Sequence, residues 1–487
     1  MSVPSRRARL AALAFAALLA ACANPGVRPA PHALTDPATL GLTTDAGSAG
    51  WPAERWWQQL GDTELAALVE RALAGQPSLR QAEARVRLAD AAVASASATR
   101  EPQVQLSADA TGQRFSARSV YPPPLGGSTH LIASTQLGAS WEVDLFGRQR
   151  AALDAAIGQQ RAAAADAQAA RQWLAASVVA HGFALAHQLQ RERLAADAVR
   201  LRQQALALVD ERVAAGLDTQ AERLQAQGQV AAARAEHAAL AEAVARERHA
   251  LAELSGQAPA ALATLAAAWH APTEKLPTRV SADLLGRRAD LVALRWRVQA
   301  ALRDVDLART RFLPDLNLVA FAGLSSLGLD QLLQLGARTY GVGPALRLPV
   351  FEGGRLRAQL AAREADADAA IEAWNSALLR AVREAADELA TLQTLQAQQA
   401  AQADASAAAR AAQALAQQRR QAGLGNRLAV LGADAALLAQ QRQALDLQAR
   451  QRAAEVALVR ALGGGYHAGP DDLPPAPAQA ALNPIPR

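Results

Sequence analysis

The chain of 487 residues has one cysteine, one methionine and one lysine, and aromatic residues make up only 4% of it. The single cysteine, Cys22, excludes an intramolecular disulfide and a cysteine-based metal cluster. The single methionine excludes a ladder of thioether ligands for soft metals. Ala, Leu, Gln, Arg and Glu dominate what remains, and this composition is typical of long helices and coiled coils.

Sequence motifs of enzyme chemistry are also missing. The chain contains no HExxH, Walker A, GxSxG or dinucleotide-binding pattern. His181 and His187 are six residues apart, and His237 and His249 are twelve apart, so neither pair has the i,i+4 spacing of a helical metal site. Gly463-Gly-Gly is followed by tyrosine rather than lysine and marks a helix end. The sequence therefore predicts no enzyme, no metal and no cofactor.

The charge pattern excludes a second class of function. The net charge of +5 is small for this length, and arginines are interspersed with Asp and Glu. A nucleic-acid-binding surface needs clustered positive charge, so no nucleic-acid partner is expected. Beyond the N-terminus, the sequence has no run of about 18 apolar residues, the length that a transmembrane helix needs. Any membrane crossing must then be made by strands.

The N-terminal segment has the pattern of an export signal. Residues 1–21 combine Arg6, Arg7 and Arg9 with the apolar stretch 10–19, which is too short to span a membrane. Leu19-Ala-Ala-Cys22 resembles the lipobox of bacterial lipoproteins, which implies a lipid on Cys22 after cleavage. Ala23 in place of aspartate implies the outer membrane in that family. A plain secretory signal with a chance cysteine is the alternative. Residues 22–50, rich in Pro, Gly and Thr, are expected to form a lipid-anchored tether.

The chain contains an internal duplication, with one copy at residues 51–259 and the other at residues 260–466. Four positions of the first copy recur at an offset of 212 in the second: Leu79, Arg85, Val86 and Pro102 correspond to Leu291, Arg297, Val298 and Pro314. Further on, Ala215-Gly-Leu matches Ala422-Gly-Leu at an offset of 207, as a difference in loop length would cause. Such a duplication predicts one structural unit used twice, with the two copies packed side by side. Residues 467–487 are expected to form a disordered tail.

Each copy is predicted to contain a β-hairpin and a long helical hairpin. The β-hairpins are expected at about 103–145 and 314–350, because apolar and polar residues alternate there over about ten residues per strand, as in transmembrane barrels. In the second copy the alternation is weaker, since Val319 and Phe321 fall on the polar face. A soluble amphipathic sheet is the alternative.

The helical hairpins are expected at about 148–256 and 354–463. In the first, Leu194, Leu201 and Leu208 repeat every seven residues, as in a coiled coil. Each hairpin has a glycine turn, at which glycine suits the left-handed position after a helix. A helix of about 65 residues is near 100 Å long.

Four strands are too few to close a pore. The smallest membrane barrels of one chain use eight strands, and each unpaired backbone group in lipid costs several kcal/mol. If these strands lie in a membrane, several chains must combine them.

Four segments resemble the TolC-like outer membrane factors of tripartite efflux pumps, in particular the lipoprotein branch that includes OprM and NodT. They are Arg309-Thr-Arg-Phe-Leu-Pro314, Leu348-Pro-Val-Phe-Glu-Gly-Gly-Arg355, Ala215-Gly-Leu-Asp218 and Ala461-Leu-Gly-Gly-Gly-Tyr466. The resemblance extends over about residues 51–466. It implies a mostly α fold with a transmembrane β-barrel part. It also implies a homotrimer with a twelve-stranded barrel in the outer membrane and a tunnel of long helices in the periplasm.

The resemblance also implies roles for individual residues. The turns at Gly216-Leu217 and Gly423-Leu424 are expected to contact a periplasmic adaptor protein. Leu428 matches the apolar residue that narrows the pore. Four residues beyond it, Gly432 replaces an aspartate that is common in the family, so Asp434 and Glu222 are the candidate acidic residues at this gate.

The function that the resemblance implies is a passive exit duct for small toxic compounds. An inner-membrane transporter is expected to supply the energy for export. Two alternatives remain: an outer-membrane channel for type I protein secretion, and a periplasmic adaptor protein. The sequence does not name the exported substrates.

Overall fold

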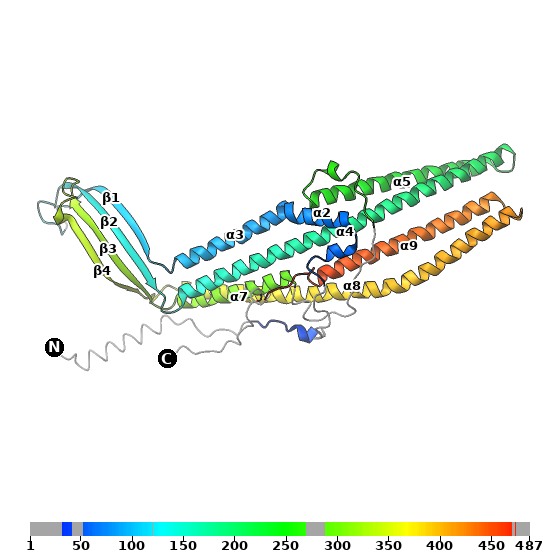
Figure 1. Cartoon of the computed structure of the whole chain (residues 1–487). Helices are drawn as coiled ribbons and strands as arrows, with labels where there is room; N and C mark the ends of the chain where they lie inside the picture. The colour runs from blue at the N-terminus through cyan, green and yellow to red at the C-terminus, as the bar shows by residue number, and fades with distance from the viewer. Residues whose placement is uncertain (1–31, 41–51, 119, 269–287, 470–472, 474–487) are drawn as a thin grey trace. The chain divides into compact units, whose positions relative to one another are not determined.

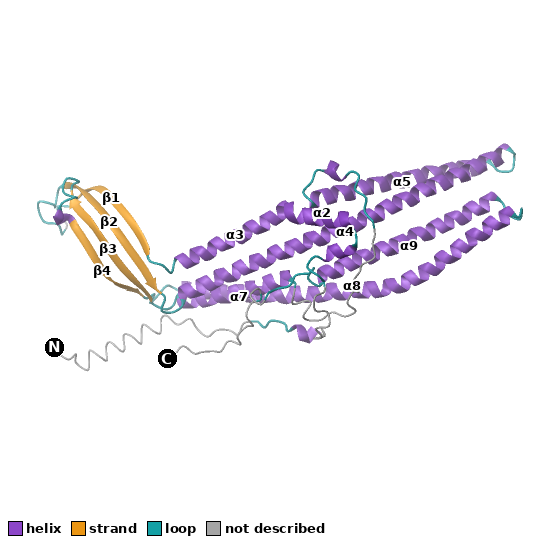
Figure 2. Cartoon of the chain, viewed as in Figure 1, coloured by secondary structure: helices purple, strands orange, loops and turns teal. Residues whose placement is uncertain are grey.

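The computed structural model describes residues 32–40, 52–118, 120–268, 288–469 and 473. The described residues are mostly helical and include four strands, as Figures 1 and 2 show. The elements in chain order are η1 (Pro37–Leu40), η2 (Trp56–Leu60), α2 (Thr63–Gly75), α3 (Pro77–Ala98), β1 (Gln103–Arg114), β2 (Thr129–Val143), α4 (Arg148–Ala214), α5 (Gln220–Leu254), η3 (Pro259–Leu262), α7 (Ala289–Thr310), β3 (Asp315–Leu327), η4 (Leu335–Ala337), β4 (Arg338–Arg347), α8 (Arg355–Gln421) and α9 (Arg427–Ala461).

The sequence duplication is repeated in the secondary structure. Helices α3 and α7 both have 22 residues, α4 and α8 both have 67, and α5 and α9 both have 35. The predicted fold class of long helices and paired β-hairpins is confirmed. The strands have 12, 15, 13 and 10 residues, so most exceed the ten that alternation predicted.

The chain divides into two compact units, and each sequence repeat contributes to both. The first unit contains residues 86–163 and 294–374, with all four strands; the second contains residues 35–85, 164–293 and 375–487. The predicted signal peptide and tether fall mostly outside the described residues, as does the predicted tail. In the part of the chain that is described, no helix has an apolar stretch long enough to cross a lipid bilayer.

The four strands of the first unit form one antiparallel sheet in the order β1-β2-β3-β4 (Figure 2). Among the described residues, β1 pairs only with β2, and β4 only with β3, so each has one free edge. Side chains alternate between the two faces of a strand. On one face β1 carries Val104 and Leu106, which are 63% and 72% exposed. On the other face β1 carries a row of polar side chains from Gln103 to Gln113.

An ion-pair network joins the sheet to the helices of its own unit. The Arg148 guanidinium at the start of α4 lies 3.5 Å from Glu142 of β2 and 3.3 Å from Asp315 of β3. It also donates a hydrogen bond to the Thr310 carbonyl at the end of α7. Because one side chain contacts two strands and a helix, it links the end of the first β-hairpin to the start of the second.

Small residues allow the helices of the first unit to pack closely. A Cβ atom added at Gly158 of α4 would lie 2.9 Å from Ala300 Cβ of α7, so only glycine fits there. Elsewhere on α7, Val305 and Phe312 pack against Leu360 of α8 in an apolar cluster. These contacts satisfy the apolar faces that the helical periodicity predicts.

The hydrophobic core of the second unit forms around the short helix α2. Asp62 caps this helix by accepting a hydrogen bond from the Leu65 amide at 2.9 Å. Leu65 then packs so close to α4 that a Cβ at Gly182 would lie 2.6 Å from its Cδ1. The cluster is completed by buried residues of α4 (174–185), α5 (244–252) and α9 (456–459). Because residues from both repeats meet in this core, it holds the two helical hairpins together.

Candidate functional site: the turns and groove of the helical hairpins

The turn between α4 and α5 is set by one glycine. Gly216 has φ +73°, a left-handed conformation that L side chains rarely adopt. Its amide donates to the Val213 carbonyl at 3.0 Å, and the Leu217 amide donates to the Arg212 carbonyl at 2.8 Å. This pair of bonds is the Schellman motif, which satisfies carbonyls at the helix end. The chain is thereby turned at a fixed angle toward α5.

The turn between α8 and α9 has the same backbone. Gly423 has φ +74°, its amide donates to the Arg420 carbonyl, and the Leu424 amide donates to the Arg419 carbonyl. The two turn leucines, Leu217 and Leu424, are 69% and 73% exposed. Each turn therefore presents one unburied leucine from a rigid backbone.

Both return helices begin at a capped residue. Thr219 accepts from the Glu222 amide, and the Glu222 carboxylate accepts from the Thr219 amide at 2.6 Å, which completes a capping box. Asn426 accepts from the Ala429 amide at 2.8 Å. The Glu222 side chain, predicted as a gate acid, thus has a structural role at the start of α5.

Paired charges surround the first turn. The Arg212 guanidinium donates two hydrogen bonds of 2.7 Å to the Asp218 carboxylate. These bonds hold the pKa of Asp218 below its ordinary value and raise the pKa of Arg212. Arg223 donates to Asp210 at 2.8 Å. The bidentate pair bridges the end of α4 and the residue before the cap of α5, and it stiffens the turn.

The second turn lacks such acidic partners. Gly425 occupies the place of Asp218, and Arg419 the place of Arg212. Residues 417–430 contain three arginines and no acid, whereas the matching residues 210–223 contain four acids and two arginines. The two turns therefore carry net charges of opposite sign, +3 and −2.

A groove of about 410 Å³ lies beside the turns of the second unit. Its walls include Asp218 and Glu222 from the first hairpin, and Leu428 and Gly432 from the second. The structure thus brings together two of the sequence-predicted gate residues, Glu222 and Leu428. Leu428 is 43% exposed.

Asp434, the third predicted gate residue, has a different partner. Its carboxylate accepts a hydrogen bond of 3.0 Å from the Gln413 amide of α8, and it does not line this groove. Gly432 does line the groove, one helical turn after Leu428, but it has no side chain and therefore contributes no charge there.

A second groove segment of about 320 Å³ contains a link between the hairpins. The Arg442 guanidinium of α9 lies 3.0 Å from the Glu236 carboxylate of α5. Nearer the core, His187 of α4 lies 2.8 Å from Asp446 of α9. Sequence reasoning missed both links, because pairs more than 200 residues apart leave no local pattern. It also missed the Arg212–Asp218 pair, whose signal is an arginine and an aspartate on either side of a turn glycine.

Among the described residues, no group of three or more His, Cys, Asp or Glu side chains could hold a metal ion. Cys22 lies outside the described residues. The first residue that is described, His32, contacts α8 through Asp368 and Glu372.

Comparison with known proteins places this arrangement in a family. The sequence model of the family named "Outer membrane efflux protein" matches residues 68–257 and 280–464. The multidrug resistance outer membrane protein MdtP of Escherichia coli strain K12 is 33% identical over 464 residues, which cover 93% of this chain and 95% of MdtP. The chain therefore belongs to the outer membrane efflux protein family, and it is an outer-membrane efflux channel.

Solved structures agree with this assignment. The outer membrane protein VceC of Vibrio cholerae matches with a TM-score of 0.78 and 35% identity, over 86% of this chain and 100% of VceC. The outer-membrane channel OprN matches with a TM-score of 0.77 and 28% identity, over 91% of this chain and 99% of OprN. The family is defined by efflux and not by a catalysed reaction. The alternative of a periplasmic adaptor protein is therefore wrong.

Proposed function

We propose that three copies of this chain join their sheets into one twelve-stranded barrel in the outer membrane. The free edges of β1 and β4 carry the proposal, because backbone groups left unpaired in lipid cost several kcal/mol each. Pairing β1 of one copy with β4 of the next removes every edge when the ring closes. Closed point-group symmetry is the usual arrangement of identical subunits.

The two faces of the sheet support a water-filled barrel. Val104 and Leu106 of β1 share a face with Leu137 and Trp141 of β2, and this face suits acyl chains. The opposite face carries glutamine, serine and acidic side chains on β1 and β2, and it suits a wet lumen.

The helical hairpins form the periplasmic end of the proposed duct. A periplasmic adaptor protein contacts the turns at Gly216-Leu217 and Gly423-Leu424, where each exposed leucine can enter an apolar pocket of the partner. The opposite charges of the two turns give that partner two different surfaces to recognise.

Opening of the duct requires that the ends of the hairpins separate. The apolar core that joins the hairpins lies around α2. Farther along, the partly exposed Arg442–Glu236 pair links them. An exposed ion pair contributes about 0.2–1 kcal/mol, so docking of a partner can replace it at low cost. Leu428, together with its copies in the trimer, narrows the closed pore.

The proposed function also includes a lipid anchor for the chain and a class of exported compounds. A lipid on Cys22 attaches the chain to the inner leaflet of the outer membrane, since each buried methylene contributes about 0.8 kcal/mol. The relative MdtP is named for multidrug resistance, and small toxic compounds or drugs are the cargo that we propose. An inner-membrane transporter of the RND or a similar type supplies the energy, because the chain has no nucleotide-binding motif.

Gene deletion tests the role in export. A strain without this chain should retain toxic compounds and become more susceptible to them, and the intact gene should restore export. A Cys22→Ala variant tests the anchor separately, because it should reach the periplasm without a lipid. Unchanged susceptibility to every compound tried would contradict a role in drug efflux and would favour secretion of proteins.

A further inference from the structure

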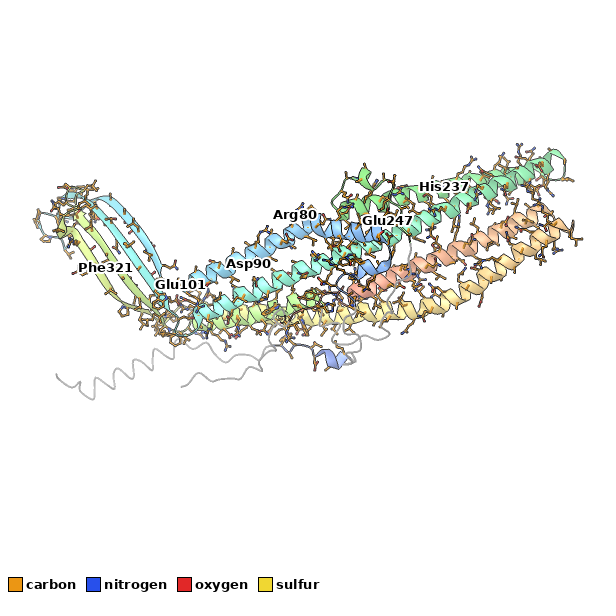
Figure 3. The ribbon with its side chains drawn as sticks, in the orientation of Figure 1. Arg80, Asp90, Glu101, His237, Glu247 and Phe321 are labelled. Carbon is orange, nitrogen blue, oxygen red and sulfur yellow. The ribbon has the colours of Figure 1, made fainter. Side chains whose placement is uncertain are left out.

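Phe321 interrupts the polar face of the sheet. Residues paired across antiparallel strands project from the same face, and Phe321 pairs with Gly138 of β2, which pairs in turn with Gln105 of β1. Phe321 therefore lies on the face that carries the glutamine and serine side chains. It is the seventh of the 13 residues of β3, so it lies at the middle of the strand. Figure 3 labels it within the sheet.

Glycines flank this ring in both neighbouring strands. Phe321 pairs with Gly138 on one side and Gly341 on the other, and its neighbour Val319 pairs with Gly343. None of these three glycines is among the described glycines with positive φ, so backbone conformation does not require them. Glycine inside a strand weakens the sheet and often marks a place that a ligand or another backbone approaches.

The glycines differ in what they leave room for. A Cβ atom at Gly341 would lie 2.7 Å from Cε1 and 2.9 Å from Cζ of Phe321, so the ring lies over the backbone of β4. A Cβ at Gly343 would meet no atom within 4 Å, and one at Gly138 would meet only Gln105 Cγ at 3.9 Å. Phe321 is 37% exposed. Gly341 thus positions the ring, and the other two glycines leave open space around it.

We propose that Phe321, held over Gly341, is a stacking site for planar aromatic molecules inside the barrel. The proposal rests on the proposed function, because the polar face lines a pore only when three copies close the barrel. Aromatic rings stack with centroids about 4.5–7 Å apart, and a positive charge on the ligand adds attraction to the ring face. Gln136 and Ser140, on the same face of β2, can add hydrogen bonds.

Lipid is the less suitable occupant of this face. Phe321 shares it with Gln105, Ser107 and Gln136, and burying such amides and hydroxyls against acyl chains without partners is costly. A single ring also binds a passing solute weakly, which suits a conduit because its cargo must leave.

Equilibrium binding of ethidium, a planar aromatic cation, to the purified full-length trimer tests the site. Fluorescence anisotropy gives the dissociation constant, and the probe can enter from the outer end whether or not the periplasmic gate is open. Phe321→Ala should weaken binding roughly three- to tenfold, the range that loss of one aromatic pair implies. Phe321→Trp should retain it.

Two glycine variants provide the matched control. Gly341→Ala should displace the ring and weaken binding about as much as Phe321→Ala, whereas Gly343→Ala should leave the dissociation constant within about twofold because its methyl group meets no atom. Equal effects of the two alanines, or an unchanged constant in Phe321→Ala, would overturn the proposed site.

Fluorescence quenching distinguishes a pore from a lipid environment. The added tryptophan of Phe321→Trp should be quenched by aqueous acrylamide and not by brominated acyl chains; the reverse result would overturn the proposal. Trimer mass and channel current are measured on the same preparation. If the protein is a conducting trimer but Phe321→Ala leaves its affinity for ethidium unchanged, only this site is refuted. If the preparation shows neither a trimer nor a current, the proposed function is refuted as well.

Discussion

The two helical-hairpin turns have the same backbone conformation, but their net charges are opposite in sign. Gly216 and Gly423 have φ values of +73° and +74°, and each is followed by an exposed leucine and a capped helix. Yet Asp218 pairs with Arg212 in the first turn, while Gly425 faces Arg419 in the second. The duplication has kept what the backbone requires and has changed what a partner would contact.

The turn conformation and the surface that a partner would recognise therefore depend on different residues. A left-handed residue after a helix favours glycine at that position, so both turns keep it. The left-handed backbone makes no such demand on the side chains around the turn, and these differ between the two turns. A partner that contacts both turns must therefore offer basic groups to one and acidic groups to the other.

The largest effect is expected at Leu428, whose counterpart in the first hairpin is Ala221. Leu428→Ala makes the second hairpin like the first, and it should increase leak current through the trimer several-fold in planar bilayers, because the proposed apolar constriction is removed. Leu224→Ala, which truncates an exposed leucine of α5 outside the groove, is the control and should not change the current. An unaltered current in Leu428→Ala would remove this residue from the gate.

Two glycines near the second turn should respond in opposite directions. Gly423→Ala should destabilise the turn by about 1–2 kcal/mol, because the left-handed conformation is strained for a side chain. Gly432→Ala should stabilise α9 by about 1 kcal/mol, since no atom lies within 4 Å of its Cβ position. Hydrogen exchange of the turn amides measures both. Faster exchange in Gly432→Ala, or no change in Gly423→Ala, would show that the turn is not limited by its backbone.

Exchange of the two charges in the Arg442–Glu236 pair tests the link between the hairpins. Glu236→Arg alone should favour the open pore, by up to about 1 kcal/mol plus the repulsion of two like charges. The double variant Glu236→Arg/Arg442→Glu should restore the closed state. Open probability in bilayers reports both, and failure of the double variant to reverse the single one would show that the pair does not hold the hairpins.

The smallest effects concern pH at one matched position of the two hairpins. His181 of α4 corresponds to Glu388 of α8 at the offset of 207. A hydrogen bond with Glu247 raises the pKa of His181 above 6.5, so its stabilisation is present below pH 6.5 and is lost as pH rises through the raised value. Burial raises the pKa of Glu388 above 4.5, so stability there falls as pH rises just above 4.5.

Glutamine variants separate these two pH windows. The thermal midpoint of the protein should lose its decline above pH 6.5 in His181→Gln, and its decline just above pH 4.5 in Glu388→Gln. Identical pH profiles for both variants and the parent protein would contradict the assignment.

Local patterns predicted most of the fold, whereas long-range pairs required the structure. The repeat offsets and glycine turns predicted both helical hairpins, and period-two alternation predicted the strands. The Thr219-x-x-Glu222 spacing carries the capping signal, although Glu222 was interpreted only as a gate acid. Alternation singled out Phe321 as misplaced, but only the strand register reveals that Gly138 and Gly341 flank it.

Cross-linking of the free strand edges tests the trimeric barrel most directly. Ser107→Cys on β1 and Thr339→Cys on β4 lie in one row of the sheet, and a flexible bismaleimide should join them between neighbouring copies in the outer membrane. We expect a ladder of covalent species that ends at three chains, with neither single-cysteine variant reaching the trimer. Only monomers, or a ladder that continues beyond three, would contradict it.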